Sequence, residues 1–148
     1  MDKYEKLKKL IERSGDSVDF ADFGDGISDE WITKAEEKLN ITLPDSYKWW
    51  LRNYSGGEVD GIEIFSIYCE DFDTVVGGDI VYMYFQNKKL YDFPDTVLPI
   101  CETDDDIYYF NTAEVNENSE YPIYSMNEDQ LIANDFIDFL TKLISGEI

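Results

Sequence analysis

The stretch of residues 27–57 most constrains how this chain can fold, because it contains two short amphipathic helices with their start and stop signals. Ser28 is a good N-cap for the first helix. Asn40 can end that helix, since asparagine tolerates a left-handed backbone. Proline suits the first position of a helix, so Pro44 predicts the start of the second helix, and Gly56-Gly57 predicts its end.

Apolar side chains recur on one face of each of these two helices, at the spacing of a buried stripe. They are Trp31, Ala35 and Leu39 in the first helix, and Tyr47, Trp50, Leu51 and Tyr54 in the second. Trp49 falls off the stripe, and it is interpreted either as a flank of the core or as an exposed aromatic.

After residue 58 the pattern changes to short strands rich in β-branched and aromatic residues. Strands are expected at 61–67, 97–101, 107–110 and 121–124, with a turn at 103–106 between the second and the third. Pro99 favours an edge strand or the beginning of a strand, because proline cannot donate to the ladder. Residues 74–91 fit neither period, and a short helix or an irregular crossing is predicted there.

A helix is also expected at each end of the chain. The first carries Tyr4, Leu7 and Ile11 on one face, and the last is predicted to be capped by Asn134. This order predicts an α+β fold with N-terminal helices, a central mainly antiparallel sheet and a C-terminal helix packed around one core. A length of 148 residues suits a single domain over 1–148.

The chain carries 33 acidic residues against 12 basic ones, a net charge of -21, and the excess is uneven. Residues 1–52 hold nine basic and twelve acidic side chains, whereas 53–148 hold three basic and twenty-one acidic ones. A field of this sign repels phosphate backbones and anionic lipid, so neither nucleic acid nor a membrane is an expected partner. Solubility alone would not require the excess to gather in one part of the chain.

Several classes of chemistry lack their residues. There is no histidine, which removes Ser-His and Cys-His catalysis and most transition-metal sites. No phosphate-binding glycine motif occurs. Cys69 and Cys101 lack metal-like or redox-like spacing and are expected to be free thiols, with a disulfide as the alternative. No cofactor, no metal and no enzymatic activity are therefore expected, and the absence of a signal peptide or spanning segment predicts a cytoplasmic protein.

Acidic clusters beside aromatic rings are the strongest candidate for a site, because interfaces favour aromatic anchors and carboxylates complement Arg and Lys on a partner. Solvated acidic loops, or a site for Ca²⁺ or Mg²⁺, are the alternatives. The predicted partner-binding residues are Glu70, Asp71, Asp73, Asp104, Asp105, Asp106, Tyr108 and Trp49.

The order of these elements resembles the SUKH superfamily, which includes bacterial immunity proteins and shares its domain with a yeast cell-wall assembly regulator. The resemblance rests on the Leu43-Pro44-Asp45-Ser46-Tyr47 restart between two helices and on the following glycine pair. Segments 97–100, 121–124 and 134–140 match later strands and the closing helix of the family. Asn40 replaces a usual glycine, and 104–106 replace a turn that commonly contains one.

The resemblance implies no catalytic residues, since the family shares none. It implies an immunity protein that binds and neutralises a cognate polymorphic toxin, with a nuclease as the expected class, through the acidic surface. The toxin would present a basic active-site surface, and the immunity protein would be a monomer or a weak dimer. The alternative is a non-catalytic regulatory or scaffold protein that binds another host protein.

Overall fold

The computed structural model describes residues 2–68 and 77–148. The first part of the chain is mainly helical, with one short strand. Its elements are α1 (Lys3–Arg13), a single 3-10 turn (Gly15–Ser17), β1 (Val18–Phe20), α2 (Asp29–Leu39) and α3 (Asp45–Tyr54).

Strands dominate the second part, which contains one helix in the middle and one at the end. The elements are β2 (Gly57–Val59), β3 (Ile62–Ile64), α4 (Ile80–Tyr91), β4 (Val97–Glu102), β5 (Ile107–Asn111), β6 (Ile123–Ser125), β7 (Gln130–Ala133) and α5 (Phe136–Ile144). The seven strands form one sheet in the order of the sequence, and every neighbouring pair is antiparallel. The predicted α+β class is therefore confirmed.

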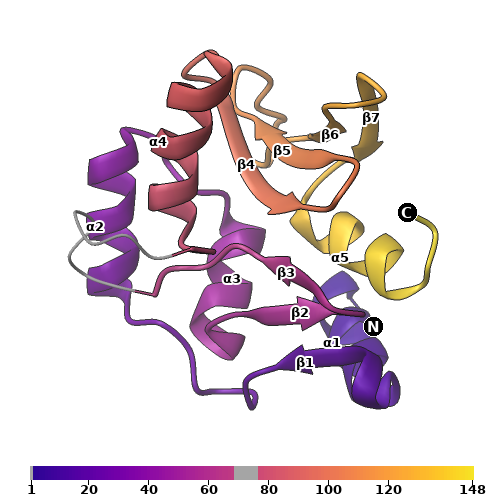
Figure 1. The fold of residues 1–148 in the computed structure, drawn as a ribbon. Coiled ribbons are helices and arrows are strands. Elements are labelled where there is room, and N and C mark those ends of the chain that lie inside the picture. Colours follow the sequence, from indigo (N-terminus) through magenta and orange to yellow (C-terminus); the bar gives the residue numbers. More distant parts are fainter. Residues whose placement is uncertain (1, 69–76) are drawn as a thin grey trace.

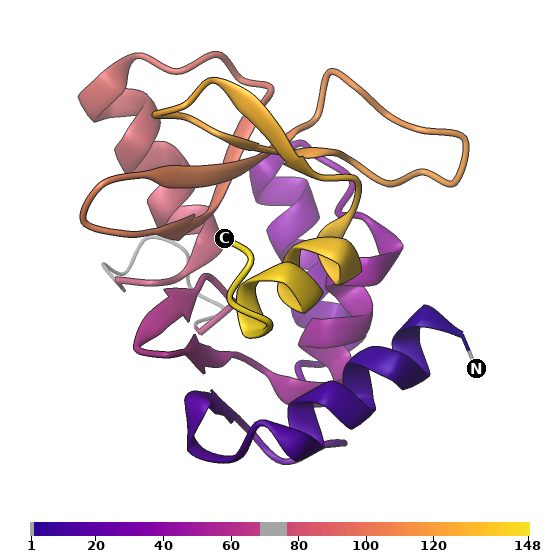
Figure 2. The same ribbon diagram turned by 90° about the vertical axis from the view of Figure 1, so that its right-hand side faces the viewer.

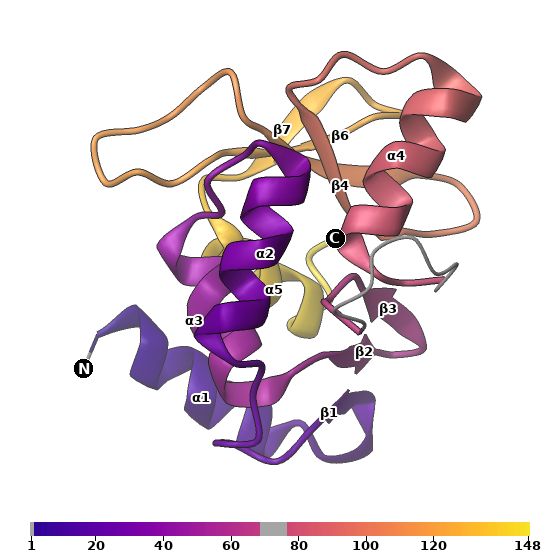
Figure 3. The ribbon, with the colours of Figure 1, turned by 90° about the vertical axis from the view of Figure 1, so that its left-hand side faces the viewer.

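The sheet bends so that its two halves lie on different sides of α5 (Figure 1). Strands β1–β3 form the lower half and β4–β7 the upper half, and α5 also contacts α1, α3 and β7 (Figure 2). Helices α2 and α4 pack side by side on the opposite flank (Figure 3). Within the described ranges, no helix is both long and apolar enough to cross a bilayer.

Aromatic side chains from three elements meet in the core. The ring of Tyr47 on α3 lies 5.0 Å from Phe136 of α5 and 5.8 Å from Phe110 of β5. Trp50 lies 5.5 Å from Phe136. All four side chains are fully buried. The predicted stripe of the second helix thus packs the helical part of the chain against the sheet.

The predicted caps of the two helices in residues 27–57 are confirmed, except that the second helix begins one residue later than predicted. The Ser28 side chain accepts a hydrogen bond from Trp31 N, and Asn40 is left-handed at φ 56°. Pro44, predicted as the first helical residue, is instead the N-cap residue of α3, so the helix begins one position later, at Asp45. Gly57 pairs with β1 and has a positive φ of 141°, which favours glycine. The β1 backbone also leaves no room for a side chain, since a Cβ there would lie 2.2 Å from the Asp19 carbonyl oxygen.

Two predictions about strands were wrong. The strand expected at 61–67 is only β3, and β2 precedes it as the other arm of a hairpin whose turn places Asp60 and Gly61 at positive φ. Pro99 lies inside β4, which is flanked by β3 and β5. The sheet tolerates this proline because the register with β5 shifts between Pro99 and Cys101, and a bulge removes the need for a ladder hydrogen bond.

One helix cap outside 27–57 was predicted wrongly, and the structure decides between the two alternatives for part of the ambiguous segment. Asp135, and not Asn134, caps α5, because its carboxylate accepts from Asp138 N. Residues 80–91 of the ambiguous segment form α4. Its stripe was hard to see because the polar Asn87 is buried, where it donates to Met83 O and Glu102 Oε1, while Phe85 and Tyr91 are exposed.

Candidate protein-binding surface

A hollow of about 350 Å³ lies between the turn that joins β4 to β5 and the C-terminal end of α4. We call it the acidic hollow. Its lining combines four carboxylates with two aromatic rings and includes no Lys or Arg. The lining residues are Tyr91, Phe93, Glu102, Thr103, Asp104, Asp105, Asp106, Ile107, Met126 and Asn127.

The turn is built by hydrogen bonds around Thr103 and Asp106. Thr103 N donates to Asp106 O at 2.9 Å, and Thr103 Oγ1 accepts from Asp106 N at 3.0 Å. The Asp106 carboxylate accepts from Ile107 N at 2.8 Å, from Asn127 N at 2.9 Å and from the Ser125 hydroxyl. Asp106 therefore holds the turn to the neighbouring β6 end, and its charge is committed to the fold.

Asp104 and Asp105 differ from Asp106 in their exposure and in their hydrogen bonding. Both are exposed, and their carboxylates accept no hydrogen bond from the residues that the structure describes. Glu102 is half-buried and accepts from Asn87 Nδ2 at 2.8 Å. Two of the four carboxylates are thus available to a partner without breaking an internal contact.

The aromatic part of the hollow comes from the end of α4. The rings of Tyr91 and Phe93 stack, with centroids 5.3 Å apart and an angle of 23° between the ring planes. Tyr91 keeps 58% of its surface exposed. Aromatic side chains are enriched at protein interfaces, and free carboxylates beside one can complement Arg or Lys of a partner. Tyr91, Phe93 and Met126 were not predicted as site residues, because nothing in the sequence shows that α4 ends beside the β4–β5 turn.

The structure places the two predicted aromatic anchors away from the acidic hollow. The ring of Tyr108 on β5 points toward α5, where it lies 5.7 Å from Phe139, and it does not line the acidic hollow. Burial, helped by the Asp106 carboxylate, raises the pKa of the Tyr108 phenol. Trp49 is a flank of the core, with its ring 5.1 Å from Tyr4 and 6.0 Å from Tyr54.

The remaining predicted residues, Glu70, Asp71 and Asp73, lie outside the described residues, as does Cys69. Cys101 is a buried free thiol, and burial raises its pKa to about 12. Among residues 2–68 and 77–148, no group of three His, Cys, Asp or Glu side chains is arranged to hold a metal ion.

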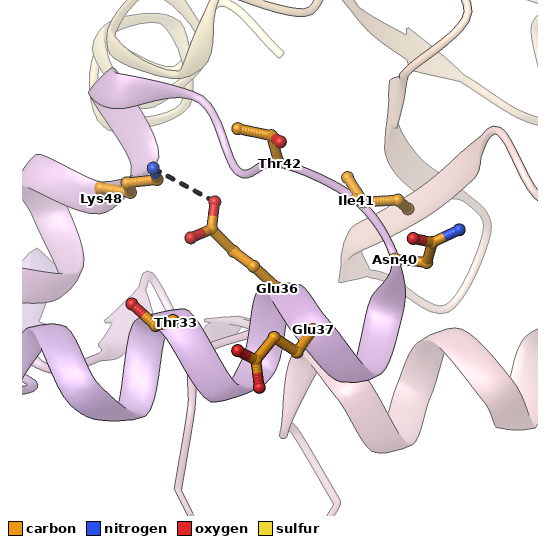
Figure 4. Close-up of a pocket in the computed structure, with 7 residues that line it drawn as sticks. All are labelled: Thr33, Glu36, Glu37, Asn40, Ile41, Thr42 and Lys48. Atoms are coloured by element: carbon orange, nitrogen blue, oxygen red, sulfur yellow. Dashed lines mark ion pairs between the residues drawn. The ribbon is translucent and has the colours of Figure 1, made fainter.

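A second hollow, of about 380 Å³, lies where α2 turns into α3 (Figure 4). Two of its charged residues, Glu36 and Lys48, serve the fold. Glu36 accepts from Leu43 N at 2.8 Å and pairs with Lys48 Nζ at 3.1 Å, and Figure 4 shows these two side chains reaching toward each other. The ion pair ties the helix–helix corner together, and we assign no ligand to this hollow.

The N-terminal helices, the antiparallel sheet and the closing helix define an α+β domain of the SUKH type. The chain belongs to the SUKH superfamily, since the SUKH_5 family model, described as SMI1-KNR4 cell-wall, matches residues 5–145. Protein YnaB of Bacillus subtilis (strain 168), itself described as uncharacterized, is 30% identical over 110 residues, which are 74% of this chain and 67% of YnaB.

A solved structure has the same fold. The crystal structure of a protein from Pseudomonas syringae pv. tomato matches 92% of this chain and 96% of its own, with a TM-score of 0.66 and 14% sequence identity. Agreement at such low identity shows the architecture and gives no information about the residues of the site.

Proposed function

We propose that this protein is an immunity protein that binds a cognate toxin and blocks it through the acidic hollow. The observation that carries the proposal is the combination, in one hollow, of the free carboxylates of Asp104 and Asp105 with the exposed Tyr91–Phe93 pair. Membership of a superfamily that includes immunity proteins supports the same function.

The chemistry of the hollow suits a basic side chain of the partner. An Arg guanidinium can bind a carboxylate through two parallel hydrogen bonds and stack on an aromatic face at the same time. Such a stacked cation contributes about 0.5–2 kcal/mol, depending on how far it is desolvated. A nuclease, whose active-site surface normally holds phosphates, presents cations of this kind.

The charge of the whole protein supports the approach of such a partner. Opposite fields accelerate encounter, and the net charge of -21 repels nucleic acid and anionic membranes. We also include Glu70, Asp71 and Asp73 in the proposed partner-binding surface, on the basis of the sequence alone. We propose a stoichiometric, non-catalytic inhibitor that needs no cofactor, acts in the cytoplasm and is a monomer or weak dimer.

Co-expression with a polymorphic toxin whose gene lies beside the gene for this chain tests the proposal. We expect growth to be rescued and a stable complex to co-purify. The variant Tyr91→Ala/Asp104→Asn/Asp105→Asn should lose both effects. The control Asp22→Asn/Asp25→Asn, which removes two exposed acids from the β1–α2 loop, should retain them. Failure of the wild-type chain to rescue growth against an active toxin would refute the immunity function.

A regulatory scaffold that binds another host protein is the second candidate. The family description, SMI1-KNR4 cell-wall, favours it. Affinity purification from the native cell distinguishes the two candidates. A scaffold would capture a host protein in cells that carry no toxin gene beside this one, whereas an immunity protein would capture the toxin.

A further inference from the structure

The basic residues of α1 form a feature that toxin binding through the acidic hollow does not explain. A groove of about 440 Å³ runs between α1 and the C-terminal end of α5, and we call it the basic groove. Its charged lining residues are all cations, although the chain as a whole has 33 acids. The lining consists of Lys6, Leu7, Lys9, Leu10, Arg13, Thr141 and Ser145.

The three cations follow one side of α1. Lys6, Lys9 and Arg13 recur at three- and four-residue spacing, so they share a face and span about 10 Å along the helix axis. All three are exposed, and within residues 2–68 and 77–148 none forms an ion pair. By contrast, Lys3 on the same helix pairs with Asp135 at 2.6 Å, and Lys8 lies over the Phe23 ring.

A structural role accounts for only part of this charge. The C-terminal end of α5 carries about half a negative elementary charge from its helix dipole, and nearby cations complement it. Three full positive charges are more than this half charge needs for neutralisation. Since unpaired like charges repel one another, an occupant with negative charge would relieve the excess.

The groove also has apolar contact area. That area comes from the half-buried Leu10, while Leu7, at 1% exposure, closes the floor of the groove beneath it. A partner that covers this groove can bury apolar side chains between α1 and α5 while its acids meet the cations. Helical segments bind grooves in this manner, with apolar anchors and charges at helical spacing.

We propose that the basic groove docks an acidic amphipathic segment of a second protein. The groove has no helix N-terminus in its lining, so it lacks the backbone N–H groups that usually hold phosphate. A nucleic acid strand would extend onto a surface of strongly negative net charge. An acidic protein segment carries fewer charges and supplies apolar side chains that can pack on Leu10.

The basic groove and the acidic hollow lie on different parts of the molecule. Figure 2 shows α1 at the bottom, far from the β4–β5 hairpin at the upper left. One protein could therefore bind a basic partner and an acidic segment at the same time. The two sites can also be tested separately, because neither set of variants touches the other set of residues.

Titration of the ¹⁵N-labelled full chain with a synthetic peptide tests this docking. The peptide is an amphipathic helix with Glu at three- and four-residue spacing beside Leu. We expect amide shifts in α1 and at the end of α5. The variant Lys6→Glu/Lys9→Glu/Arg13→Glu should bind at least about tenfold more weakly, since each exposed ion pair contributes about 0.2–1 kcal/mol. The control Lys34→Glu/Lys38→Glu/Lys89→Glu makes the same change in net charge outside the groove and should bind within about twofold of wild type.

A second peptide with Ser in place of Leu should bind more weakly, because it cannot use the apolar floor. Several results would overturn the proposal: no shifts at millimolar peptide, equal binding by the two peptides, or equal weakening by both triple variants. Saturable binding of inorganic phosphate at the same amides would identify a small-anion site instead. Concentration-dependent self-association through α1 in sedimentation would identify a second copy as the occupant.

Discussion

At the N-terminus of α4, Asp79 is 2% exposed and accepts hydrogen bonds from Tyr68 N, Val81 N and Tyr82 N. At the β4–β5 turn, by contrast, Asp104 and Asp105 face solvent and accept none from the described residues. Carboxylates that look alike in the sequence therefore have two different uses. Burial and hydrogen bonding, more than the number of acids in a cluster, distinguish the carboxylates that hold the fold from those that can meet a partner.

The largest loss of stability is expected at Asp79. Asp79→Ala removes the cap of α4 and also leaves Tyr68 N without its partner, so we expect the free energy of unfolding to fall by about 3 kcal/mol. Asp79→Asn keeps one acceptor oxygen for α4 and should lose about half as much. Urea denaturation of both variants measures the two losses. Equal losses would show that the α4 cap contributes nothing, since Asp79→Asn keeps the cap and gives up only the Tyr68 contact.

A second committed carboxylate, Glu120, comes from the long β5–β6 loop and caps α3 across 74 residues of sequence. Ser46 N donates to its Oε2 at 3.1 Å, and the Ser46 hydroxyl donates to its Oε1. Glu120→Ala leaves both buried donors unpaired, and we expect a loss of about 2 kcal/mol. A loss below about 0.5 kcal/mol in urea denaturation, the size typical of an exposed surface substitution, would show that α3 needs no such cap.

The same residue predicts a pH dependence. Burial raises the pKa of Glu120 above its usual 4.5, an effect that its hydrogen bonds to Ser46 partly oppose. Because the folded state holds the proton more tightly than the unfolded state, the contribution to stability is complete below pH 4.5 and is lost as the pH rises through the folded-state pKa. The difference in unfolding free energy between wild type and Glu120→Gln should therefore shift in favour of Glu120→Gln over that window. A difference independent of pH would contradict the raised pKa.

Within the β4–β5 turn, the same comparison can be made between the hydrogen-bonded Asp106 and the exposed Asp104. Asp106→Ala should cost about 1–2 kcal/mol, since Ile107 N, Asn127 N and the buried Ser125 hydroxyl lose their acceptor. Asp104→Ala should change the unfolding free energy by no more than about 0.5 kcal/mol. Thermal unfolding of the two variants side by side measures the difference. Similar values would mean that the turn is held by its backbone alone.

The sequence predicted what depends on short-range pattern. The α3 stripe, the Ser28 cap and the left-handed Asn40 follow from neighbours on the same helix, and each was confirmed. The α2 stripe was confirmed at Ala35 and Leu39, whereas Trp31 is half-buried and Ile32 takes the core position beside it. The approach of Tyr91 to the β4–β5 turn depends on how α4 packs against β4, and no local pattern encodes that contact. The role of Glu120 was hidden for the same reason.

The predicted site was recovered in part. The acidic turn at 103–106 was correctly predicted as a turn, but its three aspartates do not share one role, since only the structure separates Asp106 from Asp104 and Asp105. Tyr108 follows these acids closely in sequence, which is why the sequence pattern predicts it as a neighbour of the site. Alternation along a strand then turns its ring toward Phe139 and away from the acidic hollow.

Calorimetric titration of the purified toxin with three forms of this protein tests the central claim most directly. The forms are the wild type, Asp104→Asn/Asp105→Asn, and the control Asp22→Asn/Asp25→Asn. We expect the turn variant to keep its melting temperature and to bind at least about tenfold more weakly, with the control close to wild type. Equal affinities for all three proteins would contradict the claim that the free carboxylates of the β4–β5 turn bind the partner.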